Sequence, residues 1–236
     1  MSTMLYEGKA KKIFATANPQ EIIVYYKDDA TAFNGLKQGT IMDKGSMNNT
    51  ITTCLFELLG RHGIPHHHLR QLSPREALCK RVAIIPVEVV TRNVVAGSMA
   101  KKMGVPEGYV LVRPVVEFYY KNDELGDPMI NADYAEAFGF ATDEQMTQIY
   151  TMALHINAIL QDFLLTKQLQ LVDFKLEFGV DADGNVILAD EITPDTARLW
   201  DVTTKTKLDK DRFRQDLGNV EAAYQEVLQR LVGIHQ

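Results

Sequence analysis

The chain has 236 residues, of which 46% are hydrophobic and 24% are charged, as in an ordinary globular protein. Its formal net charge of −6 argues against nucleic acid as the main partner, because proteins that bind a phosphate backbone usually carry a basic excess. Only two cysteines occur, and no apolar run approaches the length of a membrane span or a signal region. We therefore expect a cytoplasmic protein with no membrane and no nucleic-acid partner.

The N-terminal part is predicted to be rich in β-structure. Strands are expected at 4–6, 11–16 and 21–26, a helix at about 46–59, and further strands at 82–85 and 87–95. Pro86 separates the last two strands and is the expected lobe boundary or hinge. This pattern predicts two lobes, 1–85 and 86–236.

The second part is predicted to be mixed. A long helix is expected from about Thr142 to Lys167, because Thr142 and Gln145 form a capping box and apolar residues follow at helical spacing. Its expected buried residues are Met146, Ile149, Tyr150, Ala153, Ile156, Leu160, Phe163 and Leu164. Two short helices are expected near 212–217 and 220–231.

The first motif is a basic turn between two strands, Tyr6-Glu7-Gly8-Lys9-Ala10-Lys11-Lys12. Gly8 allows close approach to the backbone, and the lysines could contact anionic oxygens. The turn lacks the spacing of a Walker A loop. On its own the motif is much more typical of a solvated basic turn.

The second motif runs from Ile84 to Arg92 and alternates in polarity, so that Glu88, Val90 and Arg92 share one face of a strand. Ser98 is the expected cap of a short helix that follows. A guanidinium near a helix N-terminus favours anion binding. The alternative is that Arg92 and Glu88 only pair with each other.

The third motif is Leu-Val-Asp-Phe-Lys-Leu-Glu-Phe-Gly, from Leu171 to Gly179, which places Asp173, Lys175 and Glu177 on one face of a strand. If Asp183 and Gly184 form a two-residue turn, Glu177 lies directly opposite Asp190. Two opposed carboxylates repel unless a cation separates them, and carboxylates with phosphates are the usual ligands of Mg²⁺. The alternative is a charged, solvent-facing edge hairpin.

Two polar loops and a histidine run complete the candidates. The loops at 121–128 and 193–198 lie at strand ends, where ligand groups are often mounted. Consecutive residues of a strand alternate faces, so His66, His67 and His68 are expected on the surface rather than around one metal ion.

Together, these ordered motifs resemble one family, phosphoribosylaminoimidazole-succinocarboxamide synthase, the SAICAR synthetase of purine biosynthesis. The resemblance rests on the Gly-Lys-Ala-Lys turn, Ile-Pro-Val-Glu-Val-Val-Thr-Arg with Ala-Gly-Ser, Lys-Asn-Asp with Asp-Pro, Asp-Phe-Lys-Leu-Glu-Phe-Gly, and Asp-Glu-Ile-Thr-Pro-Asp with Arg-Leu-Trp-Asp. It spans Leu5 to about Leu217. It implies a two-lobed α+β fold with a kinase-like or ATP-grasp-like nucleotide cleft.

The resemblance also implies an ATP-dependent ligase that joins the carboxylate of the ribotide CAIR to the amine of L-aspartate. ADP and phosphate are released, and an acyl phosphate is the expected intermediate. Two other functions stay open: a small-molecule kinase on a related scaffold, and a nucleotide-binding regulator without turnover. We further expect a homodimer.

Site residues follow from the same resemblance. Those implied to bind ATP are Gly8, Lys9, Ala10, Lys11, Ile85, Val87, Lys121 and Glu177. Those implied to bind Mg²⁺ are Glu177 and Asp190, and those implied to bind the ribotide are Arg92, Ser98, Asp127 and Arg198. The implied catalytic residues are Lys175, Asp195 and Arg198.

Three positions depart from the family pattern. Many members carry serine where this chain has Thr193 and Ala197, so a hydroxyl contact at Ala197 is absent. Asn34 stands where an acid is expected, and that loop is assigned no role.

Overall fold

The computed structural model describes residues 3–32 and 35–233, so Asn34 lies outside the described residues. The strands are β1 (Met4–Glu7), β2 (Lys11–Ala15), β3 (Glu21–Tyr26), β4 (Asp29–Ala32), β5 (Lys37–Thr40), β6 (His68–Ser73), β7 (Glu76–Lys80), β8 (Ala83–Val94), β9 (Val110–Tyr120), β10 (Met129–Ile130), β11 (Leu169–Val180), β12 (Val186–Ala189) and β13 (Ala197–Asp201). The helices are α1 (Lys44–Arg61), α2 (Gly97–Met103), a 3-10 turn η1 (Asp123–Leu125), α3 (Ala132–Ala137), α4 (Asp143–Thr166), α5 (Asp211–Arg214) and α6 (Val220–Val232). The mixture is that of an α+β protein, as predicted.

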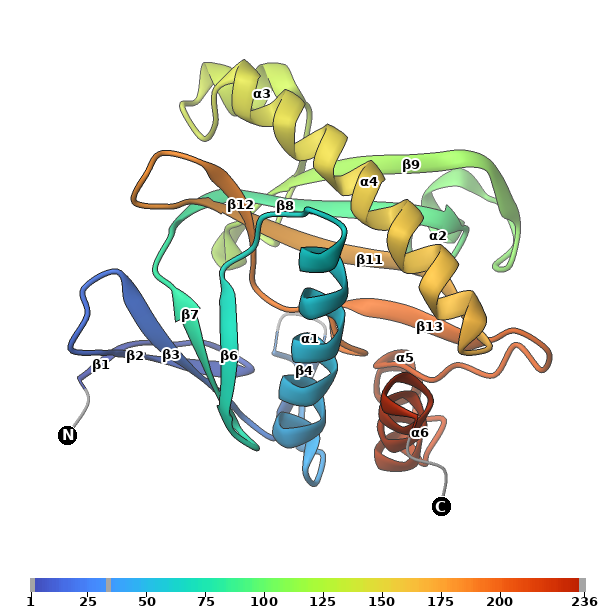
Figure 1. Ribbon diagram of the computed structural model, residues 1–236. Helices are drawn as coiled ribbons and strands as arrows, with labels where there is room; N and C mark the ends of the chain where they lie inside the picture. The colour runs from blue at the N-terminus through green and yellow to red at the C-terminus, as the bar shows by residue number, and fades with distance from the viewer. Residues whose placement is uncertain (1–2, 33–34, 234–236) are drawn as a thin grey trace.

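Two antiparallel sheets organise the molecule (Figure 1). The N-terminal sheet has the order β1-β2-β3-β7-β6, and the central sheet has the order β10-β9-β8-β11-β12. The twelve-residue β11 pairs with β8 along one edge, and with β13 and then β12 end to end along the other. The connection from β12 to β13 therefore passes beside the middle of β11.

Helix α4 crosses one face of the central sheet and forms the main core with it and with α1 (Figure 1). Thr142 Oγ1 accepts from the Gln145 amide at 3.1 Å, and Gln145 Oε1 accepts from the Thr142 amide at 3.0 Å, which confirms the predicted capping box. The predicted stripe is buried except for Phe163, which is half-buried, and Tyr150, which is 42% exposed. Each fully buried leucine or isoleucine contributes roughly 1.5–3 kcal/mol.

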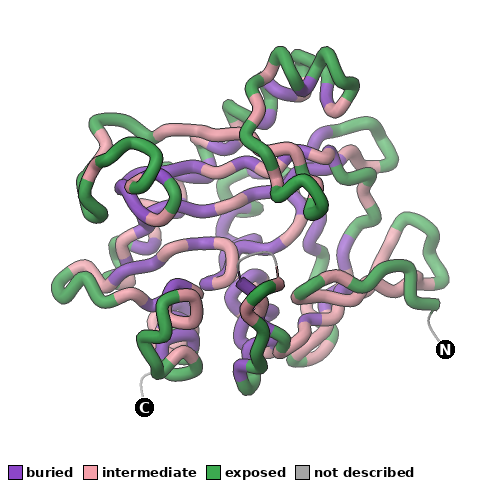
Figure 2. The backbone as a smooth tube through the Cα atoms, turned by 180° about the vertical axis from the view of Figure 1, so that it is seen from behind, coloured by how far each residue is buried: buried purple, intermediate pink, exposed green. Residues whose placement is uncertain are grey.

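Figure 2 shows that burial is concentrated along the central strands, while the hairpin ends are exposed. The chain moves from the N-terminal to the central sheet between Lys80 and Ala83. The expected strand break at Pro86 is wrong, because β8 runs through it. Proline fits there because the pairing of β8 with β11 shifts register between Glu88 and Ile84, where no ladder bond from residue 86 is needed. The division into two lobes at 85 stays a prediction.

Two other local expectations are wrong. Ser98 is not the cap of α2: the N-cap is Ala96, and Ser98 lies inside the first turn. His67 and His68 are buried rather than on the surface, because the segment from Pro65 to His67 pairs with β12 through Leu188. A three-residue histidine run carries no periodicity from which this could be read.

Candidate active site

Charged side chains gather on one face of the central sheet, and two strands supply most of them. The register of β8 and β11 pairs Glu88 with Glu177 and Arg92 with Asp173. Because every second residue of a strand points to the same face, Lys175 joins them between the two pairs. The predicted polar face of β11 is therefore confirmed, and its partner face on β8 lies beside it.

At one end of this face lies a carboxylate–lysine cluster, made of Lys11, Glu88, Lys121, Lys175, Glu177, Asp190 and Glu191. Lys175 Nζ stands at its centre, 2.5 Å from Glu177 Oε1 and 3.3 Å from Asp190 Oδ2. Its third contact is Glu88 Oε1 at 3.0 Å. Burial opposes the charge of this ammonium, but the three carboxylates outweigh burial and raise the pKa of Lys175 well above its ordinary value.

Glu177 and Asp190 meet at Lys175, but not as predicted. The hairpin loop has three residues between Asp181 and Asn185, with Gly184 left-handed at φ 86°, so Glu177 pairs with Ala189 instead of Asp190. The sequence signal Asp-Gly fits both loop lengths, and the extra residue shifts the register by one. Asp190 reaches Lys175 because its own φ of 57° turns the chain at the end of β12.

The basic turn closes over this cluster. Lys11 Nζ donates to Asp190 Oδ1 and lies 3.8 Å from Glu191 Oε2, while Lys9 Nζ donates to Asp123 Oδ1 at 2.8 Å. Gly8 and Ala10 contribute backbone groups that close the turn and join it to β3. Burial opposes ionisation of Asp190, but the ammonium groups of Lys11 and Lys175 outweigh it and lower the pKa of Asp190 far below its usual range.

The loop after β9 contributes one lysine to the cluster. Lys121 Nζ donates to Glu177 Oε1 at 2.8 Å, and the Lys121 amide donates to the Pro86 carbonyl at 3.0 Å. Asp127 is not a member of this cluster. Its carboxylate accepts from the Asn122 amide at 2.9 Å and shapes the loop. The side chains of Ile85 and Val87 are buried in the core, so only their backbone could meet a ligand.

At the other end of the face lies an arginine cluster, made of Arg92, Ser98, Glu117, Asp173, Arg198 and Asp211. Asp173 joins the two arginines: its Oδ2 accepts from Arg92 Nη1 at 2.7 Å and from Arg198 Nη1 at 2.9 Å. The Nε of Arg92 donates to Glu117, and that of Arg198 donates to Asp211, at 2.7 and 2.8 Å. The expected alternative, an Arg92–Glu88 pair, is not formed.

The two Nη2 groups of this cluster are directed at the start of α2. Arg92 Nη2 donates to Ser98 Oγ at 3.4 Å. A Cβ on Gly97, which is left-handed at φ 54°, would lie 2.4 Å from Arg198 Nη2. Gly97 therefore leaves the space that the second guanidinium occupies, and two planar donors and a hydroxyl converge there as an anion would require.

Asp195 lies between the two clusters along the chain, and its side chain is held on every side. Its Oδ2 accepts from Lys44 Nζ at 2.6 Å and from Asn48 Nδ2 at 2.8 Å. Its Oδ1 accepts from Tyr224 OH at 2.8 Å and lies 3.5 Å from Lys210 Nζ. Burial opposes ionisation, but the two lysines outweigh it and lower the pKa of Asp195 well below its usual range.

Several of these residues were missed from the sequence. Lys44 and Asn48 are buried side chains of α1. The sequence pattern of a helix identifies only its apolar stripe, so buried polar residues such as these are not predicted. Tyr224 and Asp211 come from the C-terminal helices, for which the sequence shows no spacing signal. Ala197 is buried in the core and Thr193 Oγ1 accepts from the Asp195 amide, so the threonine hydroxyl shapes the loop.

Asp209 gives the first prediction, on the pH dependence of stability. Burial, and next the charge of Asp211, raise the pKa of Asp209 to about 7, from an ordinary value of about 3.9. Between about pH 4 and pH 7 the folded state therefore binds more protons than the unfolded state, and this contribution to stability is lost as pH rises. The unfolding free energy of the wild type, minus that of Asp209→Asn, should fall between pH 5 and pH 8, by at most about 1.4 kcal/mol per pH unit. A difference that stays flat in urea titrations would contradict this assignment.

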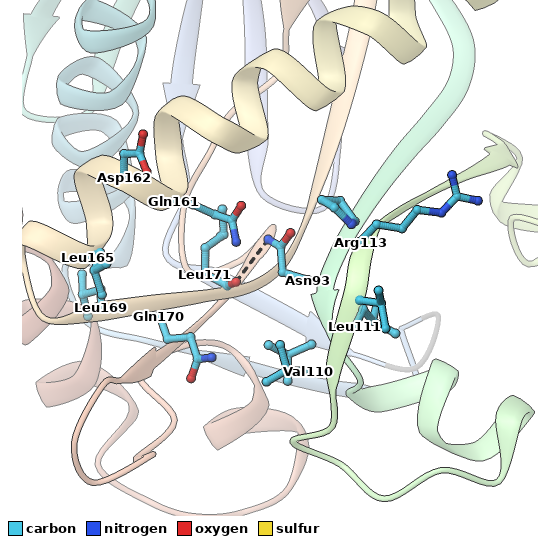
Figure 3. A pocket seen from close by; sticks show the side chains of 13 residues that line it. Asn93, Val110, Leu111, Arg113, Gln161, Asp162, Leu165, Leu169, Gln170 and Leu171 are labelled. Carbon is cyan, nitrogen blue, oxygen red and sulfur yellow. Dashed lines mark hydrogen bonds between the residues drawn. The ribbon is translucent and has the colours of Figure 1, made fainter.

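A cavity of about 400 Å³ lies outside the charged face (Figure 3). Gln161 and Leu165 of α4 line it, together with Asn93, whose side chain donates to the Leu171 carbonyl. Neighbouring residues of a strand point to opposite faces, so Asn93 and Arg92 separate this cavity from the arginine cluster. Among residues 3–32 and 35–233, no three or more His, Cys, Asp or Glu side chains are arranged to hold a metal, and no helix is long and apolar enough to cross a membrane.

Comparison with known proteins shows the family of this chain. The family model described as SAICAR synthetase matches residues 4–231. The chain belongs to the SAICAR synthetase family. A phosphoribosylaminoimidazole-succinocarboxamide synthase of Clostridium botulinum (strain Eklund 17B / Type B) is 58% identical over 228 residues, which are 97% of each chain.

Solved structures of SAICAR synthetases share the fold. The synthase of Ehrlichia chaffeensis superposes with a TM-score of 0.96 at 46% identity, covering 99% of this chain and all of that one. A SAICAR synthetase in complex with ADP superposes with a TM-score of 0.95, also at 46% identity, covering 99% of each chain. The predicted SAICAR synthetase fold is confirmed.

Proposed function

We propose that this protein is the ATP-dependent ligase of purine biosynthesis that joins CAIR and L-aspartate into SAICAR. The observation that carries the proposal is the single polar face of β11. It ends in a carboxylate–lysine cluster on one side and an arginine cluster on the other. Asp173 and Glu177 are four residues apart, or about 13 Å along a strand, which suits a ribotide lying between them.

The nucleotide is assigned to the carboxylate–lysine cluster. The turn from Gly8 to Lys11 covers the phosphates, Lys121 and Glu177 contact the nucleotide, and the backbone at Ile85 and Val87 contacts adenine. A relative of the same family has been solved with ADP, which supports nucleotide binding by this fold.

Mg²⁺ fits the same cluster. Four carboxylates stand against three lysines there, and the carboxylates of Glu177 and Asp190 face the same point, where both contact Lys175. Glu177 and Asp190 would hold Mg²⁺ with oxygen ligands, as this hard cation prefers, and phosphate oxygens complete the set. When bound, the ion neutralises charge on the phosphoryl group as it moves.

The ribotide phosphate is assigned to Arg92, Ser98 and Arg198, and the polar loop at Asp127 borders the ribotide. The carboxylate of CAIR then lies near Lys175 and Asp195. Lys175 offsets the negative charge that develops on the oxygens as this carboxylate attacks the γ-phosphorus and ADP leaves.

The amine of L-aspartate next attacks the acyl phosphate, the carbon–nitrogen bond forms, and phosphate leaves with one oxygen of the original carboxylate. Protons lost by the ammonium group pass to solvent or to phosphate. Water must be kept from the acyl phosphate, which it would hydrolyse. The ion pairs of Lys9 with Asp123 and of Lys11 with Asp190 support a role of the basic turn as a cover over the site.

The second prediction is the reaction itself. Purified protein with Mg-ATP, CAIR and L-aspartate should form SAICAR with one ADP per amide. A coupled assay measures the ADP, and chromatography measures the SAICAR. CAIR and L-aspartate are then omitted in turn, and ADP release should require both of them. Equally fast ADP release without L-aspartate, and no amide, would favour the kinase alternative.

Two further expectations belong with this proposal. Both cysteines are free thiols, which supports a reducing cytoplasm as the site of the reaction. A homodimer stays a prediction, and sedimentation equilibrium tests it.

A further inference from the structure

The buried histidine His67 lies where the N-terminal sheet meets the end of β12. Its amide donates to the Leu188 carbonyl at 2.8 Å, and its carbonyl accepts from the Lys80 amide at 2.7 Å. Its ring packs against Phe56, and Nε2 lies 3.0 Å from the carbonyl oxygen of Asp190. Three hydrogen bonds thus tie one residue to two sheets and to the peptide that follows Asp190.

The tautomer of this ring follows from its surroundings. A carbonyl oxygen can only accept, so the Nε2 atom that lies 3.0 Å from it carries a hydrogen. His67 therefore donates to the Asp190 carbonyl.

The Asp190 backbone needs such support. Its φ of 57° lies in the left-handed region, which is unfavourable for a residue with a Cβ. In an extended chain Asp190 would point away from the face that carries Glu177, because Ala189 is the residue opposite Glu177. The carboxylate reaches Lys11 and Lys175 only because the chain turns here.

We propose that His67 is a positioning residue: by holding the carbonyl of Asp190 it fixes the left-handed turn that aims the Asp190 carboxylate into the carboxylate–lysine cluster. Because His67 also anchors β7 through Lys80, it ties the N-terminal sheet to the same carboxylate. This inference rests on the proposed assignment of Asp190 to Mg²⁺.

The test separates the hydrogen bond from the packing of the ring. His67→Phe keeps an aromatic ring but has no donor, and His67→Gln keeps an N–H donor. Isothermal calorimetry measures ADP binding with saturating Mg²⁺ and without it. Loss of a hydrogen bond to a buried carbonyl should weaken Mg²⁺-dependent ADP binding about 5- to 150-fold in His67→Phe. His67→Gln should stay within a few-fold of the wild type, and ADP binding without Mg²⁺ should be unchanged in both.

Two further variants complete the design. His155→Phe replaces an exposed histidine of α4 and should change nothing. In Asp190→Asn, Mg²⁺-dependent binding should already be weak. Adding His67→Phe should weaken it little more, because both changes act through the Asp190 carboxylate. If His67→Phe does not fold, as judged by circular dichroism, His67→Leu takes its place.

Each result decides between defined outcomes. If Asp190→Asn weakens Mg²⁺-dependent binding and the His67 variants do not, the positioning role is wrong and the metal assignment stands. If His67→Phe and His67→Gln weaken it equally, the ring acts by packing and the inference is overturned. If Asp190→Asn has no effect, the metal assignment fails, and the inference fails with it.

Discussion

The Lys175→Met variant is expected to lose about 10²–10³-fold in kcat, the loss typical when one preorganised donor is removed from a charge-stabilising site. Lys175 is the one ammonium group in the described structure that contacts Glu88, Glu177 and Asp190 together. Without it, Lys121 still contacts Glu88 and Glu177, and Lys11 still contacts Asp190, but no ammonium group remains at the centre of the three carboxylates, where the reacting oxygens are proposed to lie. Steady-state rates at saturating ATP, CAIR and L-aspartate measure this loss.

The same variant should also be less stable. Breaking a buried charge network by removing one member costs about 3–5 kcal/mol, because the remaining charges are left without compensation. For a chain of this size that is a fall in Tm of roughly 6–20 °C. Mg²⁺ should restore part of this loss, since a divalent cation can occupy the space among the carboxylates.

Lys80→Met is the matched control, because Lys80 is exposed at the end of β7. It should keep both its activity and its Tm, with or without Mg²⁺. A Lys175→Met variant that turns over at the wild-type rate would show that this ammonium group takes no part in the reaction.

The Arg198→Lys variant is expected to bind CAIR between thirty-fold and several thousand-fold more weakly, or by about 2–5 kcal/mol. Lysine keeps the positive charge, but its ammonium group lacks the planar fork of a guanidinium. It therefore cannot donate to Asp173 and Asp211 and at the same time offer further donors to the ribotide. Because both partners are buried, Tm should fall as well, which the sequence did not indicate. Calorimetry with CAIR and with ATP separates the two ligands, and ATP affinity should be unchanged.

Arg230→Lys provides the control for this change. Arg230 pairs with Asp201 and Glu226 between α6 and β13, away from both clusters, so CAIR affinity should be unaltered. An unaltered CAIR affinity in Arg198→Lys as well would remove Arg198 from the ribotide site.

The sequence predicted those features that depend on local periodicity. Alternation along 171–179 identified the face shared by Asp173, Lys175 and Glu177, and the capping box identified the start of α4 within one residue. Both signals depend only on neighbours in the chain, and the tertiary contacts of this fold are consistent with them.

Features that depend on one extra residue or on distant contacts were not predictable in this way. The third residue of the hairpin loop changed the partner of Glu177, and only the left-handed Asp190 restored the meeting of the two carboxylates. The burial of His67 depends on pairing with Leu188, 121 positions along the chain. Such contacts are set by the packing of the sheets and leave no periodic pattern in the sequence.

The transfer of a carboxylate oxygen to phosphate tests most directly whether ATP activates the CAIR carboxylate for attack by L-aspartate. CAIR is prepared with ¹⁸O in its carboxylate and converted with unlabelled ATP and L-aspartate, and the phosphate released is examined by mass spectrometry. We expect one ¹⁸O atom in each phosphate for every SAICAR formed. Phosphate without the label would contradict this activation.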